Sequence, residues 1–329
     1  LYAMAEVIRN TEKHCLVCPG DGVEAEYCVE IAGVVAGGRD ELVANPVIST
    51  VICPSSPLRF PANSLDLLSI FSRNALPIVI IPAPLAGVGS PVTMAGTLAV
   101  ANAEALAGVA MIHILNEGSP VVYGGSSIPF DMRYGIPAHG AVEYGLFSAI
   151  AAQLARLYGL PSYAGGAACN ANLFDAQAGY EKMCTLVLPF LGGIDMVVDA
   201  GLNANSLISY DEPIIQNEIS AMVTRISKGF QVNQQTLALD VVAKVGIGGS
   251  FLGEKHTRDH AWTDFRYPLL GNRASYERWV DEGAKEMRSR AIEKAKDILV
   301  KHEPTRIRPE INKEIDEILT RASNRLQVG

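Results

Sequence analysis

The sequence lacks the signatures of nucleotide-dependent enzymes and of serine hydrolases. No Walker lysine motif occurs, and the glycine-rich stretch VGIGGSFLG at residues 245–253 follows a predicted helix, whereas a dinucleotide fingerprint follows a strand. The G-x-S-x-G elbow of α/β-hydrolases is also missing. These absences disfavour nucleotide-dependent and serine-hydrolase chemistry.

Charge is scarce, and its net sign disfavours two further classes of protein. Only 19% of the residues are charged, and the formal net charge is −8. A protein with such a field is repelled by nucleic acid and by anionic membrane surfaces. We therefore expect no nucleic-acid partner and no membrane partner, whereas neutral and cationic ligands fit this charge.

Long apolar runs and a cysteine framework are missing as well. No apolar run approaches the ~20 residues of a membrane span, and charged residues interrupt the N-terminal segment, so we expect a cytoplasmic protein. The six cysteines are scattered through apolar segments, which indicates reduced core residues. Cys15 and Cys18 form one C-x-x-C without a second pair, so a redox or zinc role is the minor alternative.

Short apolar runs alternate with turns and helices along most of the chain. The predicted strands are residues 14–18, 47–53, 77–81, 110–115, 161–165 and 194–199. The predicted helices are residues 23–35, 64–74, 91–107, 138–158, 176–191 and 211–228. We expect Ser90 and Pro91 to begin the third of these helices, because serine caps free N–H groups and proline fits the first helical position.

Apolar strands separated by helices are typical of a parallel sheet covered on both faces, either a (β/α)₈ barrel or an open doubly wound sheet. Six units fall short of eight, and the chain starts at Leu1, so we expect one or two N-terminal units to lie outside it. The composition changes after about residue 275. We predict a catalytic domain at residues 1–275 and a C-terminal helical extension at residues 276–329, with amphipathic helices at residues 278–304 and 309–327.

Two histidines of EKHTRDH could share one face of a helix. His256 and His260 are four residues apart, a spacing at which both could bind a metal, but the glutamate of H-E-x-x-H is absent. We therefore predict no metal site. The favoured role for one of them is a hydrogen bond to a substrate or to a loop carbonyl.

Polar side chains are densest after the fourth predicted strand. Six of them fall within a short span: Asn116, Glu117, Tyr123, Ser126, Asp131 and Arg133. Polar groups that follow barrel strands converge on one mouth, where active sites usually lie. The structural alternative for Asp131 and Arg133 is a simple ion pair, and the sequence leaves both interpretations open.

The segment AGGAACNANLFDAQAGYEK follows the next predicted strand. Gly165 and Gly166 would let the backbone approach a ligand closely, and Asn170 adds side-chain polarity. Asp175 is expected to be the N-cap of the following helix. Cys169 could be a nucleophile, but a packing role is favoured because no base adjoins it in the sequence.

Five segments together resemble the trimethylamine methyltransferase superfamily: AGVGSPVTMAGTLAVANAEALAG, GSPVVYGGSSIPFDMR, LARLYGLPSYAGG, FDAQAGYEK and FLGEKHTRDH. The similarity extends from about residue 15 to residue 279. Members of this superfamily are (β/α)₈ TIM-type barrels that move a methyl group from a methylamine to the Co(I) centre of a separate corrinoid protein. The resemblance implies a cytoplasmic methyltransferase of one-carbon metabolism, related to methanogenesis. It also implies no tightly bound cofactor, because the partner protein supplies the corrinoid (cobalamin).

One departure from the family pattern bears on the substrate. The archaeal trimethylamine enzyme has pyrrolysine in the loop that aligns near Ala168 and Cys169, where this chain has ordinary residues. The chain thus resembles the non-pyrrolysine branch, which includes glycine betaine methyltransferases, and this implies a quaternary amine substrate. Many relatives have Asp and Lys where this chain has Asn170 and Asn172, so the individual amine is not carried over.

The chemistry of a quaternary amine agrees with this substrate class. Its leaving group is already a neutral amine, so attack by Co(I) on a methyl carbon requires no general acid. The protein has to bind the cation, orient it and exclude water. Aromatic faces suit a fixed cation, and a betaine carboxylate requires a cationic or hydrogen-bonding partner.

We accordingly predict Asp131 and His256 as catalytic residues. The predicted substrate-binding residues are Tyr123, Phe130, Arg133, Tyr163, Asn170, Phe174 and His256. Gly165 and Gly166 are predicted to allow the corrinoid, delivered in trans, to approach. We also expect a homo-oligomer.

Two alternatives to a methyltransferase remain open from the sequence. A barrel lyase or aldolase acting on a small acid would need a metal or an essential lysine, for which Lys255 is the candidate in the mouth loops. The chain could also bind quaternary amines without catalysis. Binding without methyl transfer would distinguish that class from the enzyme.

Overall fold

A computed structural model describes residues 1–198, 201–305 and 307–326 of the protein. The chain divides into two compact units. The first comprises Leu1–Leu207 with Lys301–Gly329, and the second comprises Ile208–Val300. The assignment of residues 1–275 to one catalytic domain stays a prediction.

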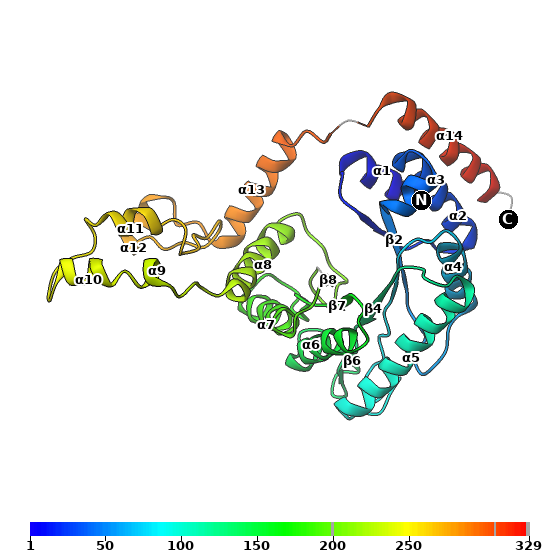
Figure 1. Cartoon of the computed structure of the whole chain (residues 1–329), viewed down its shortest axis with the longest axis horizontal. Coiled ribbons are helices and arrows are strands. Elements are labelled where there is room, and N and C mark those ends of the chain that lie inside the picture. Colours follow the sequence, from blue (N-terminus) through cyan, green and yellow to red (C-terminus); the bar gives the residue numbers. More distant parts are fainter. Residues whose placement is uncertain (199–200, 306, 327–329) are drawn as a thin grey trace. The chain divides into compact units, whose positions relative to one another are not determined.

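The first unit is built on a curled parallel sheet with strand order β1-β2-β3-β4-β7-β8 (Figure 1). Its strands are β1 (Cys15–Val17), β2 (Ile48–Ile52), β3 (Ile78–Ile80), β4 (Val121–Gly125), β7 (Ser162–Gly165) and β8 (Met196–Val198). A short antiparallel hairpin, β5 (Phe130–Asp131) and β6 (Ile136–Pro137), follows β4. The predicted α/β class is confirmed. Within the described residues the sheet is a curled half-barrel of six parallel strands, which is consistent with part of a TIM-like barrel and is not a closed barrel of eight.

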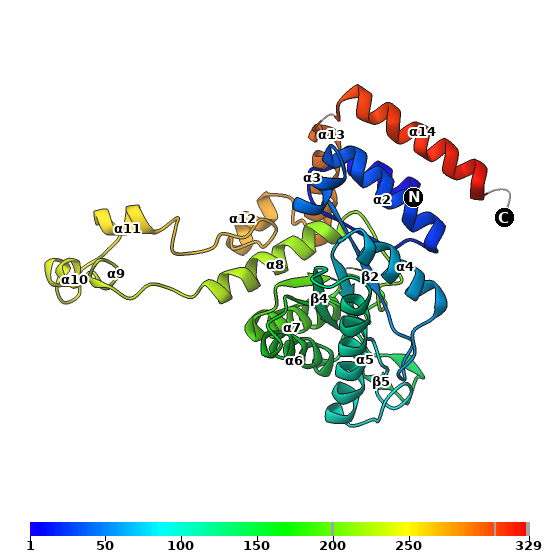
Figure 2. The same ribbon diagram turned by 45° about the vertical axis from the view of Figure 1, so that its right-hand side comes forward.

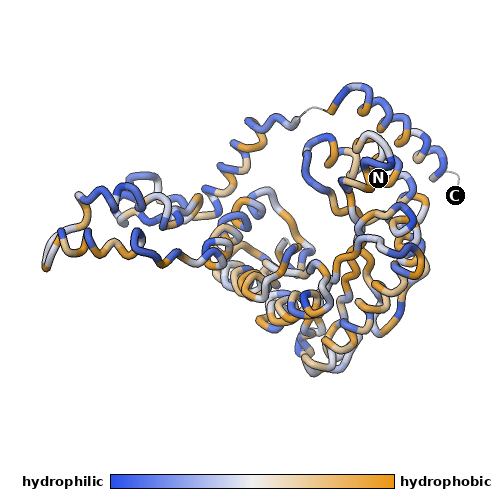
Figure 3. Tube along the Cα trace, viewed as in Figure 1, coloured by the Kyte–Doolittle hydropathy of each residue, from blue (hydrophilic) through white to orange (hydrophobic). Residues whose placement is uncertain are grey.

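Helices cover the outer face of this sheet. They are α1 (Tyr2–Asn10), α2 (Gly22–Ala36), α3 (Arg39–Ala44), α4 (Ala62–Arg73), α5 (Met94–Leu115), α6 (Val142–Leu157), α7 (Ala176–Gly192) and α14 (Pro309–Leu326). Ile48 and Ile78 point outward from the strands and pack on Ile31, Phe71 and Ile112 of the helices, all fully buried. Figure 3 shows the strands as a largely hydrophobic centre within this unit. The predicted helices 23–35, 64–74, 138–158 and 176–191 are confirmed, with ends within four residues.

The last described helix belongs to the first unit although it is distant in sequence. α14 lies beside α2 in both views (Figures 1 and 2) and buries Ile315, Ile318 and Leu319 in the main hydrophobic core. Arg321 pairs with Glu30 of α2 at 2.5 Å. The predicted amphipathic helix 309–327 is confirmed through residue 326, and residue 327 lies outside the described residues.

One predicted strand was wrong, and one helix begins later than expected. Residues 110–115 form the last turns of α5, and the strand lies further on at β4. The alanine-rich sequence from Met94 to residue 110 contains no proline, so the helix continues to Leu115, just before the turn at Gly118. The same helix begins at Met94 after Thr93, not at Pro91. Residue 199, the end of the predicted strand 194–199, lies outside the described residues.

α5 also corrects the expectation that no apolar run approaches the length of a membrane span. By length and composition alone, its 22 residues could cross a membrane. The helix nevertheless packs on β3 and β4, and it buries Glu104 and Ile112 among its core residues. A single helix of this kind is weak evidence for a membrane span, because the core helix of a globular unit has the same composition.

The second unit is helical in its described residues. It contains α8 (Glu212–Lys228), α9 (Gln234–Leu237), α10 (Leu239–Val245), α11 (Lys255–His260), α12 (Tyr276–Asp281) and α13 (Met287–Lys301). α8 confirms the predicted helix 211–228. The predicted helix 278–304 is two helices, because the chain turns at Gly283 with φ 94°.

A buried carboxylate on α8 organises this second unit. Glu218 accepts hydrogen bonds from the backbone N–H groups of Leu269 and Leu270 at 2.9 and 3.3 Å, and it pairs with Arg266 at 2.9 Å. Although burial opposes ionisation, these donors together hold the pKa of Glu218 below its usual value. The segment that follows α11 is therefore tied to α8 by one side chain.

We expect α14 to contribute substantially to the stability of the first unit. Ile315→Ala removes a fully buried side chain and should lower the free energy of unfolding by about 2–5 kcal/mol. Chemical denaturation followed by circular dichroism measures this loss. Ile114→Ala is the matched control, because Ile114 is 82% exposed and its loss should change stability by less than about 0.5 kcal/mol. Equal stabilities of the two variants would contradict the packing of α14.

Candidate active site

The loops that follow the strands of the first unit pack together at the carboxyl edge of the sheet. Ile128 after β4, Ala168 after β7 and Tyr144 of α6 form one buried cluster with Ala83 and Leu85 after β3. Parallel strands place all these loops at the same edge, which is where barrel enzymes build their sites. We therefore call this edge the mouth.

The loop after β2 is held by a buried carboxyl group of α5. Glu104 is 1% exposed. It accepts hydrogen bonds from the Ser56 hydroxyl at 2.9 Å and from the Leu58 backbone N–H at 2.7 Å. Because both donors lie in the loop, Glu104 fixes its backbone. No local sequence pattern indicates this contact, since 46 residues separate Leu58 from Glu104.

Two side chains of α7 hold the loop after β7. Lys182 is fully buried, and its Nζ donates hydrogen bonds to the carbonyls of Ala167 and Gly201 at 2.9 and 2.8 Å. Thr185 donates its hydroxyl to the Ala168 carbonyl at 3.0 Å. Sequence analysis missed Lys182, because an isolated lysine in a helix resembles a solvent-exposed one.

Asn170 joins two mouth loops through its side-chain amide. Its Oδ1 accepts from the Gly140 N–H at 2.8 Å, and its Nδ2 donates to the Pro137 carbonyl at 2.9 Å. The Asn170 N–H donates to Glu181 of α7 at 2.7 Å. A side chain at Gly140 would overlap the Glu181 carboxylate, so the loops approach as closely as they can. The structure thus gives Asn170 a role in joining loops, and its predicted contact with the substrate stays a prediction.

Asp175 at the start of α7 and the two glycines of this loop have structural roles. Asp175 accepts from the Ala178 N–H at 3.2 Å, which confirms the predicted N-cap. Gly166 has no room for a side chain, because a Cβ there would lie 2.8 Å from Val197 and 3.2 Å from the Thr185 carbonyl. Gly165 is buried within β7. Packing accounts for Gly166, and the approach of a corrinoid at these glycines stays a prediction.

His139 is a mouth residue that sequence analysis did not select. Its Nδ1 is buried and makes no hydrogen bond within the part of the chain that the structure describes. The ring lies edge-on against Tyr144, with centroids 5.4 Å apart. Burial lowers the pKa of His139, and the Pro137 carbonyl opposes this shift only in part. The ring is therefore neutral at neutral pH.

Three predicted residues line one cavity beside the hairpin. Phe130, Asp131 and Arg133 lie on a space of about 550 Å³ together with Glu143 and Phe147 of α6. Arg133 pairs with Asp131 at 2.7 Å and is 80% exposed on its side chain. The hydrogen bonds from Arg133 lower the pKa of Asp131 to about 2. Asp131 is thus an ionised carboxylate in an ion pair, and it cannot serve as a proton donor at neutral pH.

The two predicted tyrosines on strands are core residues. Tyr123 is 2% exposed and points outward, where its hydroxyl donates to Asn102 at 2.9 Å. Burial raises the pKa of this phenol. Tyr163 is 3% exposed and packs against Val79 and Ile81 on the concave face. Neither ring is open to a ligand in the described structure.

Phe174 and Cys169 differ in burial, and the predicted substrate contact of Phe174 stays a prediction. The Phe174 ring is half-buried, and its centroid is 5.8 Å from the Lys182 ammonium. Cys169 is fully buried, with its thiol directed to the Gly201 carbonyl at 3.7 Å. The packing role favoured for Cys169 agrees with this burial.

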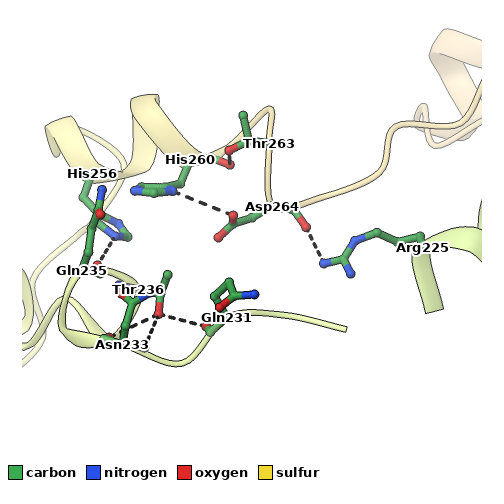
Figure 4. Close-up of polar contacts among 9 residues, drawn as sticks. All are labelled: Arg225, Gln231, Asn233, Gln235, Thr236, His256, His260, Thr263 and Asp264. Atoms are coloured by element: carbon green, nitrogen blue, oxygen red, sulfur yellow. Dashed lines mark hydrogen bonds and ion pairs between the residues drawn. The ribbon is translucent and has the colours of Figure 1, made fainter. Parts of the chain in front are cut away.

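His256 belongs to the second unit, whose position relative to the mouth is not described. Figure 4 shows its ring beside that of His260, with centroids 4.4 Å apart. His256 Nε2 lies 3.3 Å from the Gln235 carbonyl, and His260 Nδ1 lies 3.8 Å from Asp264. No cluster of three metal-binding side chains occurs among the described residues. The carbonyl next to His256 belongs to the short helix α9, so the predicted hydrogen bond to a substrate or to a loop carbonyl stays a prediction.

Exposed aromatic rings follow His256 in the same unit. Trp262 and Phe265 are 74% and 70% exposed, and Tyr267 is 49% exposed. The Trp262 and Tyr267 rings stack with centroids 4.6 Å apart. Sequence analysis placed the aromatic rings in the barrel strands and loops and missed this group, although the spacing W-x-x-F-x-Y was visible.

We expect the hydrogen bonds of Glu104 to stabilise the fold more than an exposed glutamate does. Glu104→Ala leaves the Leu58 N–H and the Ser56 hydroxyl without their partner and should cost about 1–3 kcal/mol of unfolding free energy. Glu117→Ala, at an exposed position close to the end of α5, is the control and should change little. Urea denaturation compares the two variants. An unchanged free energy of unfolding in Glu104→Ala would show that the loop does not depend on this carboxyl group.

The ion pair between Asp131 and Arg133 leads to a prediction about the pKa of Asp131. Arg133→Ala should raise the pKa of Asp131 from about 2 toward the ordinary value of an aspartate. NMR titration of the Asp131 carboxyl carbon measures this shift. Because the folded pKa is depressed, the pair favours folding only above the unfolded pKa and loses this effect as the pH falls. The pair is exposed, so we expect no measurable change in unfolding at neutral pH. An unchanged Asp131 pKa would contradict the pairing.

Comparison with known proteins places the chain in a family. The model of the trimethylamine methyltransferase (MTTB) family matches residues 1–326. A glycine betaine methyltransferase of Desulfitobacterium hafniense (strain Y51) is 36% identical over 322 residues, covering 97% of this chain and 67% of the relative. The trimethylamine methyltransferase MttB of Methanosarcina barkeri (strain Fusaro / DSM 804) is 36% identical over 318 residues, covering 96% and 64%.

A third relative, the trimethylamine methyltransferase MttB of Desulfitobacterium hafniense (strain DSM 10664 / DCB-2), is 34% identical over 302 residues and covers 91% of this chain and 61% of its own. The chain thus spans about two thirds of the length of the curated relatives it matches. The family model covers nearly every residue, and the identities exceed 30% over almost the whole chain. The chain therefore belongs to the trimethylamine methyltransferase family.

Proposed function

We propose that the protein is a cytoplasmic methyltransferase that moves a methyl group from a quaternary amine to the Co(I) centre of a corrinoid carried by a separate protein. Glycine betaine or a related betaine is the proposed methyl donor. Membership of the family supports the reaction class, and a relative described as a glycine betaine methyltransferase supports this donor. In the proposed reaction the protein itself holds no cofactor, and the corrinoid is a substrate.

The observation that carries the choice of a quaternary amine is the state of the loop after β7. Ala168 and Cys169 are both fully buried, and their carbonyls accept bonds from Thr185 and from the Ala204 N–H. This loop therefore directs no reactive side chain from these two positions into the mouth. The substrate therefore has to contain a leaving group that needs no activation by these residues, as a quaternary ammonium does.

The proposed step needs no proton transfer. The bond between the methyl carbon and nitrogen breaks, its electron pair leaves with the nitrogen as a neutral tertiary amine, and the two electrons of Co(I) form the new bond to carbon. Because Asp131 is ionised and paired, it fits a role in holding Arg133 better than one in acid catalysis. The contribution we assign to the protein is alignment of nitrogen, carbon and cobalt.

The ammonium group calls for aromatic faces, and the exposed rings after His256 form one such group among the described residues. Trp262, Phe265 and Tyr267 each expose at least 49% of their surface. A cation over such a ring gains about 0.5–2 kcal/mol. We therefore propose that this group offers a face for a quaternary ammonium on the second unit, and the contacts predicted for Tyr123 and Tyr163 stay proposals.

The carboxylate of a betaine has two proposed partners. Asp131 engages Nε and Nη2 of Arg133, and within the described residues Nη1 has no hydrogen-bond partner, so it can donate to an anion. His256 is the second. The Gln235 carbonyl only accepts hydrogen bonds, so Nε2 carries the proton and a neutral His256 presents an acceptor at Nδ1. His256 can therefore meet a carboxylate only when both of its nitrogens are protonated.

The reaction itself is tested with purified protein, reduced cobalamin and glycine betaine. We expect methylcobalamin and dimethylglycine in equal amounts, and no methylcobalamin from trimethylamine under the same conditions. Optical spectra and mass spectrometry follow the two products. Tight betaine binding without methyl transfer from any member of a betaine panel would instead support the non-catalytic binding protein. Dependence on Lys255 or on an added metal would support the lyase.

The chain has only two tryptophans, which provides a matched pair of variants. Trp262→Leu should weaken betaine binding by about 2- to 30-fold, the loss expected for one cation–π contact. Trp279→Leu is the control, because the Trp279 indole donates to the Lys285 carbonyl at 3.1 Å and has an internal role. Isothermal titration calorimetry gives both affinities. Equal affinities in the two variants would remove Trp262 from the site.

A further inference from the structure

One buried ammonium joins the loops of two neighbouring strands. Lys182 of α7 is fully buried, and its Nζ donates to the carbonyl of Ala167 after β7 and to that of Gly201, which follows β8 in the chain. β7 and β8 are paired in parallel, with Gly165 opposite Val198. The two carbonyls therefore come from adjacent positions at the mouth.

Backbone bonds extend this junction. The Ala204 N–H donates to the Cys169 carbonyl and the Asn203 N–H to the Ala171 carbonyl, both at 2.8 Å. The Phe174 ring lies above the ammonium, with its centroid 5.8 Å from Nζ. Residues 167–174 and 201–205 thus form one connected surface at the mouth. We call it the β7–β8 platform.

The use of a charged residue under this platform needs a reason. Burying an ammonium is unfavourable unless its donors are satisfied, and an apolar side chain of similar length would fill the same space. An apolar side chain, however, cannot bind carbonyl oxygens. Without the ammonium, the carbonyls of Ala167 and Gly201 would lose a shared donor, and the two loops could separate. Charge at this position therefore favours a fixed loop geometry over simple packing.

We infer that Lys182 is a positioning residue for methyl transfer: its ammonium holds the β7–β8 platform in the geometry that orients the methyl donor. This inference rests on the proposed function. Lys182 touches neither substrate nor cobalt. Because in-line displacement depends steeply on alignment, a displaced platform slows the chemical step more than it weakens binding.

The test compares Lys182→Met with Lys313→Met in the full chain. Lys313→Met makes the same change at an exposed position of α14, where the lysine side chain is 79% exposed. With reduced cobalamin and glycine betaine, Lys182→Met should lower kcat by roughly 10- to 100-fold, with KM changed by less than about 3-fold. Lys313→Met should keep the wild-type values.

Hydrogen exchange supplies a readout that does not depend on activity. In Lys182→Met, peptides from residues 166–174 and 201–207 should exchange faster, whereas peptides from β2 and β3 should keep their wild-type protection. Unchanged exchange in the platform, or an unchanged kcat, would overturn the inference. An equal rise in KM and fall in kcat/KM at constant kcat would also overturn it, because that pattern describes lost binding.

A second variant covers the case in which Lys182→Met does not fold. Thr185→Val removes only a hydroxyl, which lies 3.0 Å from the Ala168 carbonyl and 2.8 Å from the Glu181 carbonyl of its own helix, and it changes no charge. It should lower kcat several-fold and speed exchange in the same loop, and wild-type behaviour would contradict the inference. An inactive wild-type protein would reject the proposed function, whereas an active wild type with unchanged Lys182→Met would reject the inference alone.

Discussion

The mouth of the first unit depends on one constraint: loop backbone that is buried must find hydrogen-bond partners. At this edge of the sheet the partners are charged side chains from the outer helices. Glu104 of α5 accepts from the loop after β2, and Lys182 of α7 donates to the loops after β7 and β8. The two residues have opposite charges because the first loop presents N–H and O–H groups and the second presents carbonyls.

This construction limits the chemistry of the mouth. The fixed loops offer shape and backbone dipoles, while the polar side chains that looked reactive are engaged elsewhere. Asp131 is paired with Arg133, and both amide atoms of Asn170 bind neighbouring loops. A reaction that needs alignment more than proton transfer suits such a site. Methyl transfer from a quaternary amine is a reaction of that kind, and the family membership of the chain agrees with it.

Short sequence patterns correctly predicted the features that depend on neighbouring residues. The α/β alternation, the N-cap at Asp175 and the packing role of Cys169 follow from period, capping and burial within a short window. The prediction of a strand at residues 110–115 was wrong, because a continuous apolar helix and a buried strand have similar compositions. Lys182 and Glu104 were missed for another reason. Their partners are 15 to 48 residues away, and the sequence does not state which surface lysine or glutamate turns inward.

The central claim is that buried charges make the mouth loops as rigid as the strands. Hydrogen exchange of the wild-type protein, resolved to single amides by NMR, tests it most directly. The Leu58 and Asn170 amides, which bind Glu104 and Glu181, should be protected to the level of Ile80 in β3, whereas the exposed hairpin amide of Met132 exchanges freely. Leu58 and Asn170 exchanging as fast as Met132 would contradict the account.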